Sequence, residues 1–230
     1  MTIVKRHYDA SSRRRQASAR RHAVVLAAKA LFERDGFRAT TIAAVAERAG
    51  VSAESIYKGF GTKAALAKAV FDFVIAGDDA AVPVAQRAEA DAVRAEPDAA
   101  RKILLYTRGL AARQHRSANV QIFIRDGRHT DETLAAVWEE LLVERLNGMT
   151  MLGQHLMQSG QLSDRIDVAE VRDVLWTYTA VEVYELLVLK RGWSVDRYAE
   201  CLGHAIIGAL MQPPRHDDLQ VTVRPDAPLP

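Results

Sequence analysis

The chain has 230 residues, of which 49% are hydrophobic and 26% are charged, so it has enough apolar surface for a packed core and is not a disordered protein. Its formal net charge is only +2, so the kind of partner has to be inferred from where the charges lie. The single cysteine, Cys201, excludes an intrachain disulfide framework and a cysteine-based zinc site.

No secretory signal is found near the N-terminus, and no membrane span is expected. The apolar stretch 176–189 contains Glu182 and Glu185, which do not suit a bilayer core. A soluble cytoplasmic protein is therefore expected.

Residues 1–22 carry an excess of basic side chains, with seven Lys and Arg against the single Asp9. Because residues 1–16 also lack apolar periodicity, we predict a mobile basic arm there. Whether this arm touches DNA phosphates or is only a solvated tail stays open at this point.

A helix is predicted over about 17–35, because apolar residues recur at helical spacing and Gly36 follows. A helix-turn-helix is predicted directly after it, in residues 40–66. Its first helix is capped by Thr41 and stopped by Gly50, and Ser52 caps the second after one intervening residue. The second helix turns Ile56 inward and presents a polar outer face that suits a DNA major groove.

The segment 36–66, GFRATTIAAVAERAGVSAESIYKGFGTKAAL, resembles the DNA-binding head of the TetR family of bacterial transcription regulators. That resemblance implies an all-α homodimer, usually a repressor, with an N-terminal three-helix head and a C-terminal helical domain for effector binding and dimerisation. Its partners would be a palindromic double-stranded DNA operator and a small-molecule effector of unknown identity. The domains expected are a basic arm (1–16), a DNA-binding head (17–61), a body (62–212) and a flexible tail (213–230).

The resemblance also assigns roles to residues of the head. Phosphate contacts are expected from Thr41, Ser52, Tyr57 and Lys63. The side chains expected to face base edges are Ala53, Glu54, Ser55 and Lys58. Three positions depart from the family pattern: Ala44 removes half of a capping box, Gly59 replaces a bulky residue, and Glu54 brings negative charge to the groove face.

In the body we predict helices over about 80–95, from Asp98 to His115, from a cap at Ser117 to Gly127, and over 131–159, 168–190 and 195–211. Apolar walls with a few polar groups are typical of small-molecule sites. The candidate effector-binding residues are Tyr106, Phe123, Trp138, Met151, His155 and Trp176.

The last two helices are expected to form a hairpin that pairs with its copy in a four-helix interface. The candidate interface residues are Tyr198, Cys201, Leu202, Ala205, Ile206 and Ala209. The alternative is that this stripe packs only within the subunit.

An enzyme is the main competing class, and the sequence offers no motif for it. There is no HExxH, no GxxxxGK[ST], no GxSxG and no GxGxxG after a strand. His129, Asp131 and Glu132 lack further ligands at clear spacing, so no metal and no cofactor are expected. The alternative function is a helical small-molecule-binding protein or enzyme whose head does not read DNA.

Overall fold

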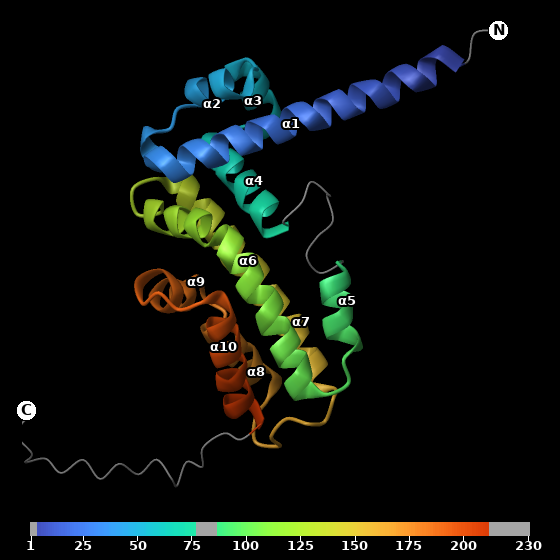
Figure 1. The fold of residues 1–230 in the computed structure, drawn as a ribbon, viewed down its shortest axis with the longest axis vertical. Helices are drawn as coiled ribbons and strands as arrows, with labels where there is room; N and C mark the ends of the chain where they lie inside the picture. Colours follow the sequence, from blue (N-terminus) through green and yellow to red (C-terminus); the bar gives the residue numbers. More distant parts are fainter. Residues whose placement is uncertain (1–3, 77–86, 212–230) are drawn as a thin grey trace, which may run out of the picture.

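The computed structural model describes residues 4–76 and 87–211, and all regular elements in these ranges are helices (Figure 1). The all-α prediction is therefore confirmed. The elements are α1 (Val4–Ala39), α2 (Ile42–Ala49), α3 (Ala53–Phe60), α4 (Lys63–Ala76), α5 (Ala88–Ala95), α6 (Ala99–Gly127), α7 (Glu132–Met157), α8 (Val168–Tyr178), α9 (Val181–Tyr184), a π-helix (Glu185–Lys190) and α10 (Val195–Met211).

The head consists of α2 and α3 packed on α1 (Figure 1). Both caps predicted in the head are present: Thr41 Oγ1 accepts from the backbone N–H of Ala44 at 3.1 Å, and Ser52 Oγ accepts from the backbone N–H of Ser55 at 3.2 Å. Gly50 ends α2 with a φ of +66°, a left-handed conformation that costs glycine little.

Helix α1 begins at Val4, and not near residue 17 as expected. Residues 4–35 contain no glycine or proline and are rich in Arg and Ala, which have good helix propensity, so the helix continues without an apolar face to guide it. The predicted stop is correct, because Gly36 lies outside helical geometry at φ +80°. The N-terminal part of α1 projects beyond the head (Figure 1).

The body is built around one long helix, α6, where two helices were predicted. Asp98 caps it by accepting from the backbone N–H of Arg101 at 2.7 Å. Ser117 is not a cap: it is buried in mid-helix, and its hydroxyl donates to the carbonyl of Arg113 at 2.9 Å. A serine hydroxyl satisfied by its own helix needs no break there.

The predicted helix over 168–190 is interrupted after α8. Thr179 is buried at the break, and its carbonyl accepts from Gln114 Nε2 at 3.1 Å while its hydroxyl donates to Met149 Sδ at 3.4 Å. Neighbouring helices thus satisfy the polar groups that the break exposes.

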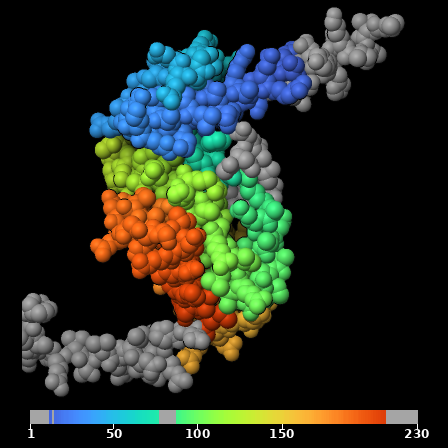
Figure 2. Space-filling model, viewed as in Figure 1, coloured from blue at the N-terminus to red at the C-terminus, as the bar shows by residue number. Residues whose placement is uncertain are grey.

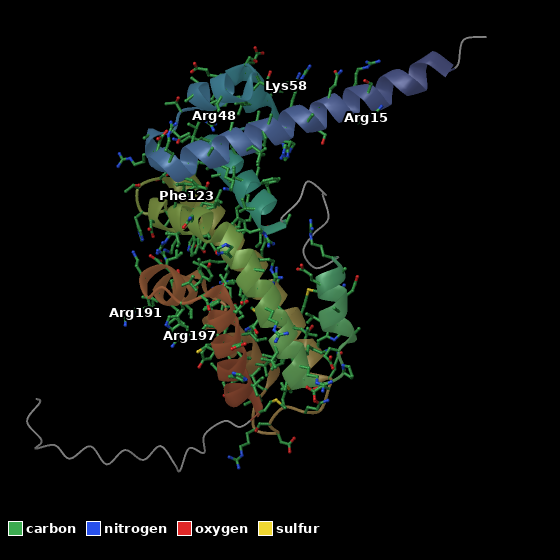
Figure 3. All side chains as sticks on the ribbon, viewed as in Figure 1. Arg15, Arg48, Lys58, Phe123, Arg191 and Arg197 are labelled. Atoms are coloured by element: carbon green, nitrogen blue, oxygen red, sulfur yellow. The ribbon has the colours of Figure 1, made fainter. Side chains whose placement is uncertain are left out.

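The head and body meet through α4, which packs against both α1 and α6. Phe123 of α6 lies against Phe32 and Phe37 of the head, with ring centroids 5.4 and 6.3 Å apart (Figure 3). Arg116 of α6 donates to the carbonyls of Val74 and Ile75 at the end of α4. A movement of α6 is therefore mechanically connected to α4.

Part of the expected helix over 80–95 and the expected tail at 213–230 lie outside the described residues, as does the start of the arm. Across 4–76 and 87–211, no helix combines the length and the apolar character that crossing a membrane requires.

Candidate DNA-binding face and effector cavity

The outer face of α3 is open to solvent. Glu54, Ser55 and Lys58 are exposed, Ala53 is half-exposed and Tyr57 is 54% exposed. Figure 3 shows Lys58 pointing away from the rest of the head. Of the residues predicted to contact DNA, these five therefore share one accessible face.

The opposite face of α3 is fixed to α1. Ile56 is 1% exposed, and Arg21 of α1 donates to the carbonyl of Gly59 at 3.2 Å while its guanidinium lies 4.2 Å from the centroid of the Phe60 ring. In the sequence, Arg21 stands out only as one of the basic residues near the N-terminus. Arg21 and Gly59 lie 38 positions apart in the chain, so no local sequence pattern predicts the contact between them.

Thr41 and Ser52 are exposed at the starts of α2 and α3. Their side-chain oxygens cap the helices by accepting backbone N–H groups, and Ser52 also shares a 2.8 Å hydrogen bond with the Ser55 hydroxyl. Caps at these positions place helix N-termini on the head surface, and such termini suit phosphate oxygens.

Lys63, for which a phosphate contact is predicted, makes contacts inside the head. Its ammonium donates to the carbonyls of Phe37 at 2.8 Å and Thr40 at 3.0 Å, and it lies 4.2 Å from the centroid of the Phe37 ring. Burial lowers the pKa of Lys63, and the charge of Asp131 partly opposes that shift. The ammonium thereby links the α1–α2 connection to α4, and two of its three N–H donors are used in doing so.

The body contains a cavity of about 890 Å³ lined by α4, α5, α6 and α7 and by part of α1. The surface is hollowed between α5 and α6 in Figure 2. Three of the six predicted effector-binding residues line the cavity: Tyr106, Met151 and His155. Gly148 also lines it, with no atom within 4 Å of the position that a Cβ would take.

The other three predicted residues lie elsewhere. Phe123 belongs to the joint with the head. Trp138 is buried in the core, with the guanidinium of Arg128 lying 5.5 Å from its ring centroid. Trp176 lies beside the cavity wall, where the guanidinium of Arg145 stacks 3.6 Å from its ring centroid. An apolar stripe does not reveal which of its members border a cavity.

The cavity wall also carries cations that are not among the predicted effector-binding residues, above all Lys102, Arg113 and Arg145. Lys102, Tyr106 and Arg113 lie on one face of α6, because positions separated by four and seven residues align on a helix. Arg145 comes from α7. The spacing on α6 was visible in the sequence, but the pairing with α7 was not.

Burial changes the ionisation of this part of the wall. It lowers the pKa of Arg145, which Glu182 and Tyr106 partly oppose. It raises the pKa of Tyr106, against the nearby charges of Arg113 and Arg145. Both guanidinium groups therefore act on the same phenol.

The residues of α10 that were predicted to form the dimer interface fall into two groups, one buried inside the subunit and one facing outward. Tyr198, Leu202 and Ile206 are buried inside the subunit, and the Tyr198 hydroxyl donates to Gln114 Oε1 at 2.8 Å. Burial raises the pKa of Tyr198, and its bond to Gln114 opposes the rise. These three residues cannot form a surface; their helix packs on α6.

The remaining members of the stripe face outward: Cys201 is exposed, and Ala205 and Ala209 are half-exposed. Leu186 and Leu189 of the neighbouring π-helix are 61% and 45% exposed. Arg191 and Arg197 point outward on this side of the body in Figure 3.

Among His129, Asp131 and Glu132, the candidate metal ligands in the sequence, Asp131 has a structural role. The carboxylate of Asp131 caps α7 by accepting from the backbone N–H groups of Thr133 and Leu134 at 2.9 and 3.1 Å. These bonds, led by the one to the Thr133 hydroxyl, hold the pKa of Asp131 below its usual value. Within 4–76 and 87–211, no three His, Cys, Asp or Glu side chains are grouped as metal ligands.

Comparisons with known proteins agree with this architecture. The family model described as "Bacterial regulatory proteins, tetR family" matches residues 24–70. No curated protein matches the chain in sequence.

Solved structures match over most of the chain. A transcriptional regulator FadR from Bacillus subtilis, in complex with stearoyl-CoA, has a TM-score of 0.66 at 17% identity, covering 84% of this chain and 99% of its own. A putative TetR-family regulator from Rhodococcus sp. has a TM-score of 0.64 at 20% identity, with the same coverages. A putative regulator from Saccharomonospora viridis, in complex with choline, has a TM-score of 0.61 at 16% identity and covers 84% and 97%.

The predicted resemblance is thereby confirmed: the chain carries the N-terminal domain of the tetR family of bacterial regulatory proteins and has the fold of solved regulators of that family.

Proposed function

We propose that the protein is a ligand-responsive, DNA-binding transcription regulator, acting as a homodimeric repressor that a small-molecule effector releases from a palindromic operator. The observation that carries the proposal is the outer face of α3. Glu54, Ser55, Tyr57 and Lys58 are exposed there and Ala53 is half-exposed, while Ile56 is buried and Arg21 bonds the end of the helix from the opposite side. A short, fixed helix with a free polar face suits the major groove.

In this proposal, Thr41, Ser52 and Tyr57 contact phosphates and set affinity, whereas Glu54 and Lys58 contact base edges and set sequence. Lys58 suits a guanine and Glu54 suits a cytosine amine. Lys63 is left out of the contact set, because its ammonium is engaged within the head.

The cavity supplies the place for an effector. Relatives of the same fold were solved with stearoyl-CoA and with choline, so bodies of this kind accept small molecules. The cavity is bordered by α4 and α6, and Arg116 joins α6 to the end of α4, which leads to the head. An effector that prefers the non-binding conformation a hundredfold would weaken operator binding by up to about 2.7 kcal/mol.

The dimer is proposed on the outer side of the π-helix and α10. Leu186 and Leu189 are large apolar residues exposed to solvent. Cys201, Ala205 and Ala209 of α10 also face outward, and their small side chains allow close approach of a second copy. A two-fold axis there would present two heads to half-sites about 34 Å apart.

The test is selection of bound sequences from random double-stranded DNA by the ligand-free protein. We expect enrichment of a palindrome. If no palindrome is enriched, the protein does not act as the proposed reader, and the alternative of a helical small-molecule-binding protein or enzyme would take its place.

A further inference from the structure

We propose that the effector is an apolar molecule with an anionic group, and that Arg113, Arg145 and Tyr106 bind that anion. This inference rests on the proposed function insofar as it calls the ligand an effector. The binding site itself is argued from the cavity alone.

Arg145 has donors to spare. Its Nη1 donates to the carbonyl of Trp176 at 2.6 Å and reaches Thr179 Oγ1 at 3.5 Å, while no acceptor among the described residues is bonded to Nε or Nη2. Every fully buried side-chain nitrogen or oxygen in the described part of the chain has a partner. The remaining donors of Arg145 are therefore not fully buried, and Arg145 is one of the residues that line the cavity.

No carboxylate in residues 4–76 and 87–211 forms an ion pair with Arg145. Glu182, the carboxylate whose charge opposes the lowering of the pKa of Arg145, is already bonded to Arg125 at 3.4 Å. A half-buried guanidinium without a paired carboxylate loses hydration that an anionic ligand would replace.

Arg113 adds a second guanidinium to the same place. Its side chain is 13% exposed, and its only carboxylate in the described ranges, Glu89, is 3.9 Å away and 72% exposed. Such a long, solvent-exposed pair is weak. The guanidinium lies 5.8 Å from the Tyr106 ring centroid, and the Tyr106 hydroxyl donates only to the poor acceptor Met149 Sδ at 3.7 Å.

Two of the three acidic residues among the described lining of the cavity are engaged elsewhere, and the third, Glu89, is largely exposed to solvent. Asp72 and Glu144 are both bonded to Lys68, at 2.9 and 3.1 Å, and these bonds raise the pKa of Lys68 despite its burial. No comparable partner neutralises Lys102, which is 5% exposed and bonds only to the carbonyl of Arg94 at 3.3 Å within the described residues. The charges on the described part of the wall therefore favour an anion over a cation.

The rest of the wall favours an apolar chain. Leu105, Leu110, Leu141, Met149 and Leu152 line the cavity, and its volume of about 890 Å³ lies within the usual range for small-molecule sites. The chemistry that fits is an amphipathic carboxylate or phosphate.

The experiment is isothermal titration calorimetry of the full chain, without DNA, against three probes of equal chain length: decanoate, methyl decanoate and decyltrimethylammonium. We expect decanoate to bind at least tenfold more tightly than the other two. Arg113→Gln and Tyr106→Phe should each weaken decanoate binding, Arg113→Gln by about tenfold, and leave methyl decanoate binding unchanged. Arg108→Gln, at an exposed position of the same helix outside the cavity wall, is the matched control and should have no effect.

The inference is overturned if methyl decanoate or the cation binds as tightly as decanoate, if none of the three binds, or if Arg113→Gln leaves decanoate affinity intact. Because no DNA is present, these results are independent of the sequence selection above. A protein that enriches a palindrome but shows no preference for the anion would retain the proposed function and lose this inference.

Discussion

At the scale of single residues, a substitution of Lys63 tests whether its ammonium stabilises the head or contacts DNA. We expect Lys63→Met to lower the free energy of unfolding by about 1–3 kcal/mol, because the carbonyls of Phe37 and Thr40 lose a charged donor. Thermal or urea unfolding measures this loss. The slope of log K against log salt should stay unchanged, because no phosphate contact is removed.

Lys58→Met is the matched control for that experiment. Lys58 is exposed and makes no bond within the described residues, so its loss should leave unfolding within about 0.5 kcal/mol and change which DNA sequence is preferred. If Lys63→Met flattened the salt slope and left stability intact, Lys63 would be a phosphate contact after all.

At the scale of helices, the close contact between α10 and α6 depends on Gly203. A Cβ there would lie 2.7 Å from Leu104 Cδ2 and 3.0 Å from Thr107 Oγ1. Gly203→Ala should therefore destabilise the protein by about 1–3 kcal/mol despite the better helix propensity of alanine. Denaturant unfolding at a fixed protein concentration gives the value.

Gly148→Ala is the contrasting change, because a Cβ at Gly148 meets no atom within 4 Å. This variant should be more stable by about 0.5–1 kcal/mol. If Gly203→Ala and Gly148→Ala changed the free energy of unfolding equally, the close contact between α10 and α6 at Gly203 would be contradicted.

The extension of α1 carries a second prediction at this scale. Arg15 and Arg20 are exposed on one continuous helix, which projects past the head (Figure 1). If that helix lies along the DNA, replacing both by Gln should reduce the salt slope by about 0.9 per lost phosphate contact. Filter binding or fluorescence anisotropy at several salt concentrations measures it. An unchanged slope would show that the extension is only a solvated helix.

At the scale of the whole molecule, the features that could be predicted from the sequence are those that depend on residues close together in the chain, such as helix caps and helix ends. Thr41, Gly50 and Ser52 act through bonds to residues within four positions, so their roles could be predicted from spacing alone. Ser117 has the same local signal, but a serine inside a helix can bond its own turn, and the neighbouring apolar pattern continued. Trp138 and Tyr198 sit on stripes whose partner helices cannot be identified from periodicity. Arg145 reaches its site from a second helix, which only the tertiary fold brings to α6.

The last prediction concerns assembly, because two heads bind a palindrome well only when they are linked. Leu186 is 61% exposed on the proposed interface, and Val143 is 57% exposed on α7 outside it. We expect Leu186→Lys to convert a dimer into monomers in sedimentation experiments, since a buried, unpaired ammonium at an interface costs several kcal/mol. Affinity for the full palindrome should fall by at least tenfold, while affinity for a single half-site should not. Val143→Lys should change neither mass nor affinity. A dimer that survives Leu186→Lys would place the two-fold axis on another face of the body, and a wild-type monomer would remove the reason for a palindromic site.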